Sequence, residues 1–140
     1  MFNIPNSPSE VSSALADHNY LTDEGLATVV YLAISMQRPL FLEGDAGVGK
    51  TELAKVLAAW TGGELIRLQC YEGIDASQAL YEWDYTRQLL HLRAAEASGR
   101  TQKDSQAIED ELYSERFLIR RPLLRAIDYT DQQPVLLIDE

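Results

Sequence analysis

One eight-residue segment constrains this chain more than any other, because it matches the pattern G-x-x-x-x-G-K-[ST] in full. Its residues are Gly44, Asp45, Ala46, Gly47, Val48, Gly49, Lys50 and Thr51. Glycines allow the backbone to curl around an anion with its N–H groups turned inward. A lysine at this spacing reaches the β- and γ-phosphates, and the next hydroxyl is placed to ligate Mg²⁺. The segment therefore predicts a nucleoside phosphate site.

The residues on both sides of this loop favour the same interpretation. Residues 39–43 (Pro-Leu-Phe-Leu-Glu) predict a short buried strand that enters the loop. Residues 51–60 predict an amphipathic helix that leaves the loop and is closed by Gly62 and Gly63. A strand, a glycine loop and a helix N-terminus together are what an anion site needs. Glu52, which directly follows the loop, is included in the predicted binding set.

A second motif ends the sequence with an acidic pair. Residues 135–138 (Val-Leu-Leu-Ile) predict a strand covered on both faces, as in parallel α/β sheets, and Asp139 and Glu140 follow it. Asp139 is expected to supply the metal carboxylate beside Thr51. Glu140 is the candidate that orients and polarises water against the γ-phosphate. We therefore expect ATP and Mg²⁺ as cofactors, Lys50 and Glu140 as catalytic residues, and Thr51 and Asp139 at the metal.

The rest of the chain alternates helical and strand patterns without an internal repeat. The expected elements are a helix over 8–17, a helix capped by Thr22 that ends before Pro39, a strand over 64–69, a capping box at 75–78, helices over 87–97 and from 105, and a short helix from Pro122 towards Asp128.

Composition narrows the class of protein. The net charge of −10 over 140 residues argues against a direct nucleic-acid footprint, which needs clustered Lys and Arg. Cys70 is the single cysteine, which fits a reducing compartment. The longest apolar run, over 29–36, is too short to span a bilayer, and no signal peptide is apparent at the start. These features favour a soluble, cytoplasmic protein without membrane insertion.

Longer segments of the sequence resemble those of a known protein family. The stretches GDAGVGKTELAK, LIRLQCYEGIDASQALYEWDY, LYSERFLIRRPLLRAI and VLLIDE resemble MoxR-type AAA+ ATPases, and within them the CoxD-like branch. The resemblance covers residues 20–140. It implies an αβα sandwich of the P-loop NTPase type with a mainly parallel sheet. It also implies a ring, usually a hexamer, that remodels or matures a metalloenzyme client in a chaperone-like way. Tyr20 and Leu21 stand where similar proteins contact the adenine.

The same resemblance divides the chain into parts of one incomplete AAA+ domain, 1–140. These are N-terminal helices over 8–37, a phosphate-loop unit over 39–69, an insertion over about 71–121 and a Walker B strand over 135–140. It implies that strands four and five, the sensor, the arginine finger and the helical lid lie beyond Glu140. On this basis the chain alone is expected to be poorly stable and inactive, with hydrolysis confined to the intact protein.

Two other functions stay open from the sequence. One is a phosphate-loop kinase or GTPase, and the other is a nucleotide-sensing or assembly module that does not hydrolyse ATP. Tyr81, Trp83 and Tyr85 could grip a substrate or simply pack the insertion. We further expect His18 and His91 to be solvated, because neither has a second ligand at metal spacing. Cys70 is expected to be a small side chain at a strand end, and Arg120 and Arg121 to be structural or interfacial.

Overall fold

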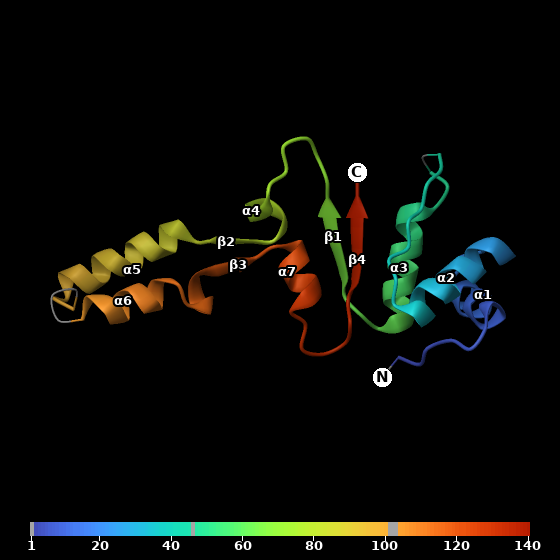
Figure 1. Cartoon of the computed structure of the whole chain (residues 1–140), viewed down its shortest axis with the longest axis horizontal. Coiled ribbons are helices and arrows are strands. Elements are labelled where there is room, and N and C mark those ends of the chain that lie inside the picture. Colours follow the sequence, from blue (N-terminus) through green and yellow to red (C-terminus); the bar gives the residue numbers. More distant parts are fainter. Residues whose placement is uncertain (1, 46, 101–103) are drawn as a thin grey trace. The chain divides into compact units, whose positions relative to one another are not determined.

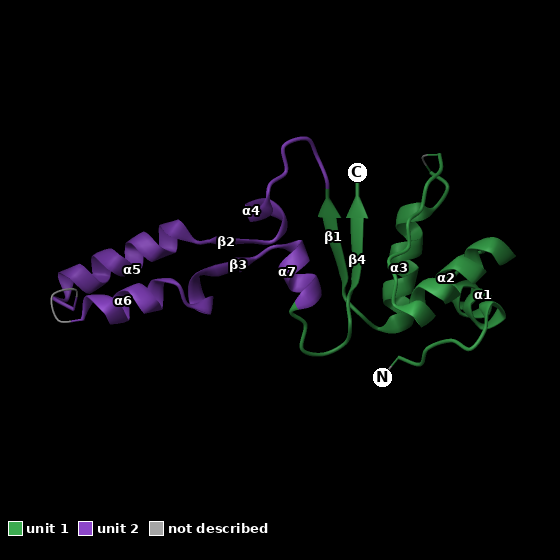
Figure 2. Ribbon diagram, in the orientation of Figure 1, with its two compact units in different colours: residues 1–69, 128–140 green, residues 70–127 purple. Residues whose placement is uncertain are grey.

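The structure, a computed structural model, describes residues 2–45, 47–100 and 104–140. The chain divides into two compact units, which Figure 2 shows in different colours. Unit 1 comprises residues 1–69 and 128–140, and unit 2 comprises residues 70–127. No helix in the described ranges is long and apolar enough to cross a membrane.

Three helices build most of unit 1 (Figure 1): α1 (Pro8–Asp17), α2 (Glu24–Met36) and α3 (Lys50–Thr61). The Asp23 side chain accepts a hydrogen bond from the Leu26 backbone N–H at 2.7 Å and so caps α2. The prediction that Thr22 caps this helix is wrong by one residue. The Thr22 hydroxyl instead donates to the Asp23 carbonyl, because the carboxylate is in the better position to reach the first turn.

The core of unit 1 lies where these three helices meet. Its buried members come from all three helices: Val11, Leu15, Val30, Leu53 and Val56. Leu40 and Leu42, from the segment that leads into the phosphate loop, pack against this cluster. The loop is therefore anchored on the helical core through the residues just before it.

Two parallel strands complete unit 1: β1 (Leu65–Gln69) and β4 (Val135–Asp139). Their register runs from Leu65 opposite Val135 to Gln69 opposite Asp139. Both strands were predicted from the sequence, and both are confirmed. Their parallel pairing is the pattern of α/β proteins, in which long connections carry the chain back to the start of the sheet.

The strand predicted over 39–43 is not present, although its side chains alternate as they would in a strand. Leu40 and Leu42 pack on the core, whereas Phe41 is 86% exposed. A strand is defined by backbone hydrogen bonds to a neighbour, and β1 and β4 pair only with each other among the described residues. The segment is therefore extended but unpaired.

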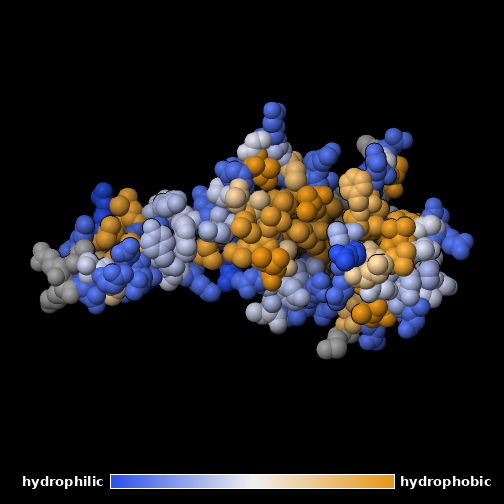
Figure 3. Space-filling model, viewed as in Figure 1, coloured by the Kyte–Doolittle hydropathy of each residue, from blue (hydrophilic) through white to orange (hydrophobic). Residues whose placement is uncertain are grey.

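The strand β4 is also less covered than its apolar sequence predicted. Ile138 is 60% exposed, and the three residues before it are only half-buried. Hydrophobic residues accordingly gather at the surface over the strands in Figure 3. The expectation of a strand buried on both faces is wrong here, because a two-stranded sheet offers too little area for helices to cover.

The described residues of unit 2, 70–100 and 104–127, form four helices, one 3₁₀ turn and a two-stranded antiparallel sheet. The elements are α4 (Ala76–Ala79), β2 (Tyr81–Trp83), α5 (Tyr85–Ala97), α6 (Ser105–Leu112), η1 (Glu115–Phe117), β3 (Leu118–Arg120) and α7 (Pro122–Ile127). The predicted capping box is confirmed, with the Asp75 carboxylate and the Gln78 side chain each bonded to the other's backbone N–H.

The helices α5 and α6 are tied together by polar contacts near Glu111. Its carboxylate contacts the His91 ring nitrogen at 2.8 Å and the Arg100 guanidinium at 2.7 Å. The Arg100 bond and then the His91 bond hold the pKa of Glu111 below its ordinary value. His91 was expected to be solvated, but its side chain is only 16% exposed and also lies beside Phe117. That expectation is wrong because the hairpin of helices covers the ring and gives it a carboxylate as hydrogen-bond partner.

The aromatic residues of unit 2 divide between packing and exposure. The Trp83 ring stands edge-on to Tyr113, with centroids 5.4 Å apart, and is half-buried. Tyr85, by contrast, is 67% exposed. The packing interpretation therefore holds for Trp83. The two arginines expected to be structural pair within this unit, Arg121 with Glu82 and Arg120 with Glu115.

Candidate functional site

The last two residues of the phosphate loop, Lys50 and Thr51, are the first two residues of α3. Gly47 and Gly49 have φ values of 84° and 93°, in the left-handed region that favours glycine. Gly49 occupies the N-cap position of α3 and has no side chain to bond the first N–H groups of the helix. Those N–H groups are the usual partners of a bound anion. Ala46, another predicted loop residue, lies outside the described residues.

The Lys50 side chain forms hydrogen bonds with the backbone of its own loop. Its ammonium donates to the carbonyl oxygens of Gly44 at 2.7 Å and Asp45 at 2.6 Å. The side chain therefore folds back across the loop. An ammonium that is held by carbonyl oxygens can exchange them for phosphate oxygens, to which its charge-assisted bonds are stronger. Val48, at the tip of the loop, is 61% exposed.

Tyr20 supports the loop from the side of the helical core. Its hydroxyl donates to the Gly49 carbonyl at 3.4 Å, and its ring lies 3.5 Å from the place a Gly49 Cβ would occupy. Burial, and to a smaller extent the negative charge of Glu52, raise the pKa of Tyr20. Leu21, the second residue expected at the adenine, is 90% exposed. The adenine contact stays a prediction for both residues.

Glu52 is engaged on the surface of α3. Its carboxylate pairs with the Lys55 ammonium at 2.8 Å, and both side chains are 56% exposed. Exposed pairs three residues apart on a helix contribute little to stability. Glu52 is therefore close enough to influence Tyr20 but is not fixed by burial.

The acidic pair stands at the same end of unit 1 as the phosphate loop. In Figure 1, the carboxyl ends of β1 and β4 and the N-terminal end of α3 lie at the same end of the unit. The C-terminus, which follows β4, also lies there. Asp139 is the last residue of β4 and is held by Arg67, whose guanidinium donates to its Oδ2 at 2.6 Å. Glu140 is exposed.

Sequence reasoning missed Arg67. A signal was present, because Arg67 lies between Ile66 and Leu68 on β1 and so faces away from these two buried residues. Finding its partner also required the parallel register, in which Arg67 stands opposite Leu137 and two residues before the level of Asp139. The sequence does not give that register.

The residues that were predicted for the metal have the right chemistry. The Thr51 hydroxyl and the Asp139 carboxylate are hard oxygen donors, which Mg²⁺ prefers. No group of three His, Cys, Asp or Glu side chains converges within the described ranges. Mg²⁺ commonly uses one or two protein oxygens and takes the remainder from phosphates and water. The donor set therefore fits a cation that arrives with a nucleotide.

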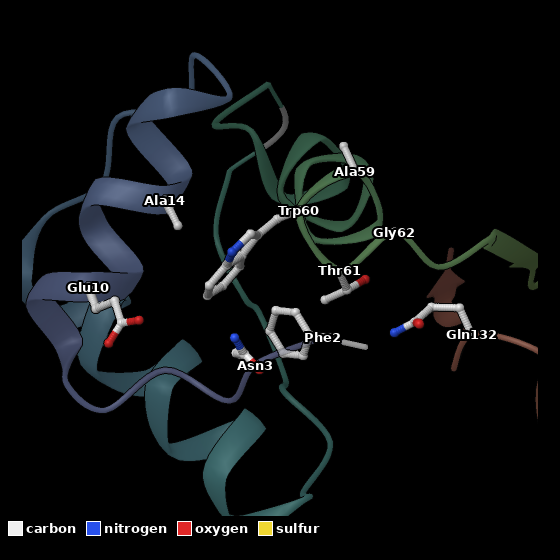
Figure 4. Close-up of a pocket in the computed structure, with 9 residues that line it drawn as sticks. All are labelled: Phe2, Asn3, Glu10, Ala14, Ala59, Trp60, Thr61, Gly62 and Gln132. Carbon is white, nitrogen blue, oxygen red and sulfur yellow. The ribbon is translucent and has the colours of Figure 1, made fainter.

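A separate open cavity of about 510 Å³ lies at the other end of α3 (Figure 4). Its lining includes Trp60 and Gly62 at the end of that helix, with Phe2 and Glu10 from the start of the chain. The rings of Phe2 and Trp60 meet edge-on, 5.2 Å apart. None of the predicted site residues lines this cavity.

Comparison with known proteins identifies the family of the chain. Residues 39–130, more than half of the chain, match the family model described as "AAA domain (dynein-related subfamily)". The chain belongs to this family. The AAA domain thus confirms the coarser part of the resemblance, a P-loop nucleotide-binding fold of α/β class with a parallel sheet.

One curated relative shows the same similarity over a shorter stretch. The chain is 44% identical over 48 residues to a protein named Midasin from Giardia intestinalis. The match covers 34% of this chain and 1% of that relative. No solved structure matches the chain significantly.

Proposed function

We propose that this AAA domain binds ATP with Mg²⁺ and, in the intact protein, hydrolyses it. One observation carries the proposal. The Lys50 ammonium lies inside the glycine loop on two carbonyl oxygens, directly at the N-terminus of α3. A positive side chain and open helix N–H groups at one place are a receptor for phosphate.

We assign separate roles in binding phosphate, Mg²⁺ and water to residues of the chain. Backbone N–H groups from Gly47 to Thr51 bind the phosphates, and Lys50 moves from the carbonyls to the β- and γ-phosphate oxygens. Thr51 and Asp139 would hold Mg²⁺, which neutralises charge on the phosphates when it is bound. Glu140 orients the attacking water and accepts its proton. Its exposure leaves the carboxylate accessible to that water.

We further propose that the protein is a MoxR-type AAA+ ATPase of the CoxD-like branch, which assembles into a ring and matures a metalloenzyme client in the cytoplasm. The segments GDAGVGKTELAK and LYSERFLIRRPLLRAI support this proposal. Within the protein, residues 8–37 form the N-terminal helices, 39–69 the phosphate-loop unit, and 135–140 the Walker B strand. Residues 71–121 form the insertion, whose range lies inside unit 2.

Substitution of Lys50 tests nucleotide binding. Lys50→Ala removes the ammonium, and we expect a loss of ATP affinity of at least tenfold by calorimetry, since charge-assisted bonds to phosphate are lost. Lys55→Ala is the matched control, because Lys55 lies on the same helix but pairs with Glu52. Equal affinities of the two variants would contradict the proposal.

Substitution of Glu140 tests hydrolysis in the intact protein. Glu140→Gln keeps the shape of the side chain but cannot accept a proton, so ATP should bind normally while phosphate release falls at least a hundredfold. Hydrolysis at the wild-type rate would show that the role given to Glu140 is wrong. A wild-type protein that binds ATP without releasing phosphate would instead be the sensing or assembly module.

A further inference from the structure

The pair of Arg67 and Asp139 joins two strands at the carboxyl end of the sheet. The register places Arg67 opposite Leu137, so Asp139 lies two residues further along β4 and on the same face as Arg67. The guanidinium Nη2 donates to Asp139 Oδ2 at 2.6 Å. This short distance is typical of a charge-assisted hydrogen bond.

This contact involves the carboxylate that the proposed function gives to Mg²⁺. The Asp139 side chain is 25% exposed and that of Arg67 is 53% exposed, so water reaches both groups. An ion pair with that exposure exchanges partners at low cost. The position of Asp139 does not depend on the pair alone, because the backbone pairing of β1 and β4 extends to Gln69 and Asp139.

We propose that Arg67 is a positioning residue that holds Asp139 in the absence of a divalent cation and competes with the cation for it. The inference rests on the proposed function. Arg67 thereby sets the Mg²⁺ concentration at which the domain binds its nucleotide tightly.

Electrostatics predicts how the charge of Arg67 changes the affinity of Asp139 for Mg²⁺. A guanidinium bonded to one carboxylate oxygen puts a positive charge within a few ångströms of any cation bound to the other oxygen. The two cations repel each other, and the carboxylate cannot fully neutralise both. Removing the charge of Arg67 therefore favours Mg²⁺ binding, whereas the strand pairing continues to hold Asp139 in place.

The experiment uses the full chain, a fluorescent ADP analogue and Mg²⁺. Binding is measured by anisotropy in EDTA and then over a series of Mg²⁺ concentrations. In Arg67→Gln we expect an unchanged affinity in EDTA and a roughly fivefold lower half-saturating Mg²⁺ concentration, as a charge interaction between water-exposed groups allows. Arg67→Lys keeps the charge and should stay near the wild-type value. Arg38→Gln, which removes an equal charge from the segment after α2, is the control.

Each other outcome counts against the inference in a distinguishable way. An unchanged or higher half-saturating Mg²⁺ concentration in Arg67→Gln overturns it while the proposed function stands. A weaker affinity of that variant in EDTA would show a merely structural role. Equal shifts in Arg67→Gln and Arg38→Gln would reflect net charge alone. A wild-type chain that does not bind the ADP analogue overturns the proposed function and this inference together.

Discussion

Gly63 lies where the turn after α3 meets the residues before β4. A Cβ at this position would stand 2.2 Å from the backbone oxygen of Gln133, which has no side-chain freedom to move away. We expect Gly63→Ala to destabilise the chain by about 1–3 kcal/mol, measured as a lower urea midpoint.

Gly25→Ala is the control for that substitution. A Cβ at Gly25 would meet its nearest atom, an Asp23 side-chain oxygen, at an ordinary 3.4 Å. Because Gly25 lies within α2, alanine there should stabilise the chain by up to about 1 kcal/mol. If both alanine variants behaved alike, the close approach at Gly63 would not determine stability.

Tyr20 offers a second test at the residue scale. Its ring packs beside Gly49, and its hydroxyl bond of 3.4 Å is long, so the ring matters more than the hydroxyl. Tyr20→Phe should bind ADP within about twofold of wild type, whereas Tyr20→Ala should lose about tenfold or more through displacement of the loop.

Pyrophosphate, which has no base, distinguishes two roles for Tyr20. If the ring acts through the loop, Tyr20→Ala weakens pyrophosphate and ADP by the same factor. A loss for ADP alone would assign the ring to the adenine instead, as the family resemblance implies.

At the scale of elements, helices were easier to predict than the sheet. The helix over 8–17 and the capping box at Asp75 depend on residues within a few positions of each other, and both are observed. The strand over 39–43 had the right side-chain alternation, yet it lacks a partner among the described residues. Pairing is a property of two segments, so a pattern within one segment does not determine it.

The contact between α5 and α6 predicts a pH dependence. Hydrogen bonds from Arg100 and His91 depress the pKa of Glu111 below its ordinary value of 4.5. A carboxylate with a depressed pKa stabilises the fold fully above its unfolded value, and this contribution is lost as the pH falls through the folded value. Glu111→Gln should therefore lower the urea midpoint at pH 7, and its difference from wild type should vanish as the pH decreases below 4.5.

Glu109→Gln supplies the comparison on the same helix. Glu109 is exposed on α6, and its substitution should leave the midpoint almost unchanged at every pH. A constant difference between wild type and Glu111→Gln down to acidic pH would show that ionisation of Glu111 does not stabilise this hairpin.

For the molecule as a whole, the division into two units predicts where a bound nucleotide slows hydrogen exchange. The phosphate loop and the acidic pair both belong to unit 1. A ligand that binds only the folded state suppresses opening of the structure that it contacts. Hydrogen exchange with ADP and Mg²⁺ should therefore show slower exchange over 47–56. The rates over 85–97 and 105–117 should stay unchanged. Protection that spreads into these two ranges would mean that the units open together.

The whole site was less predictable than its parts. Eight adjacent residues suffice to predict the phosphate loop, because every group that the anion needs lies in one short stretch. The contacts of Lys50 with the carbonyls of Gly44 and Asp45 lie within the same stretch, but they were not predicted. The pairing of Asp139 with Arg67 spans 72 residues and depends on which strands are neighbours. Contacts of that range follow from topology and not from local pattern.

The distribution of aromatic rings gives each unit its own optical reporter. The chain has two tryptophans, of which Trp60 meets Phe2 in unit 1 and Trp83 meets Tyr113 in unit 2. Both indoles are half-buried, so their emission shifts when the surrounding structure is lost. The single-tryptophan variants Trp83→Phe and Trp60→Phe would thus resolve the melting of the two units in one cuvette without any attached dye.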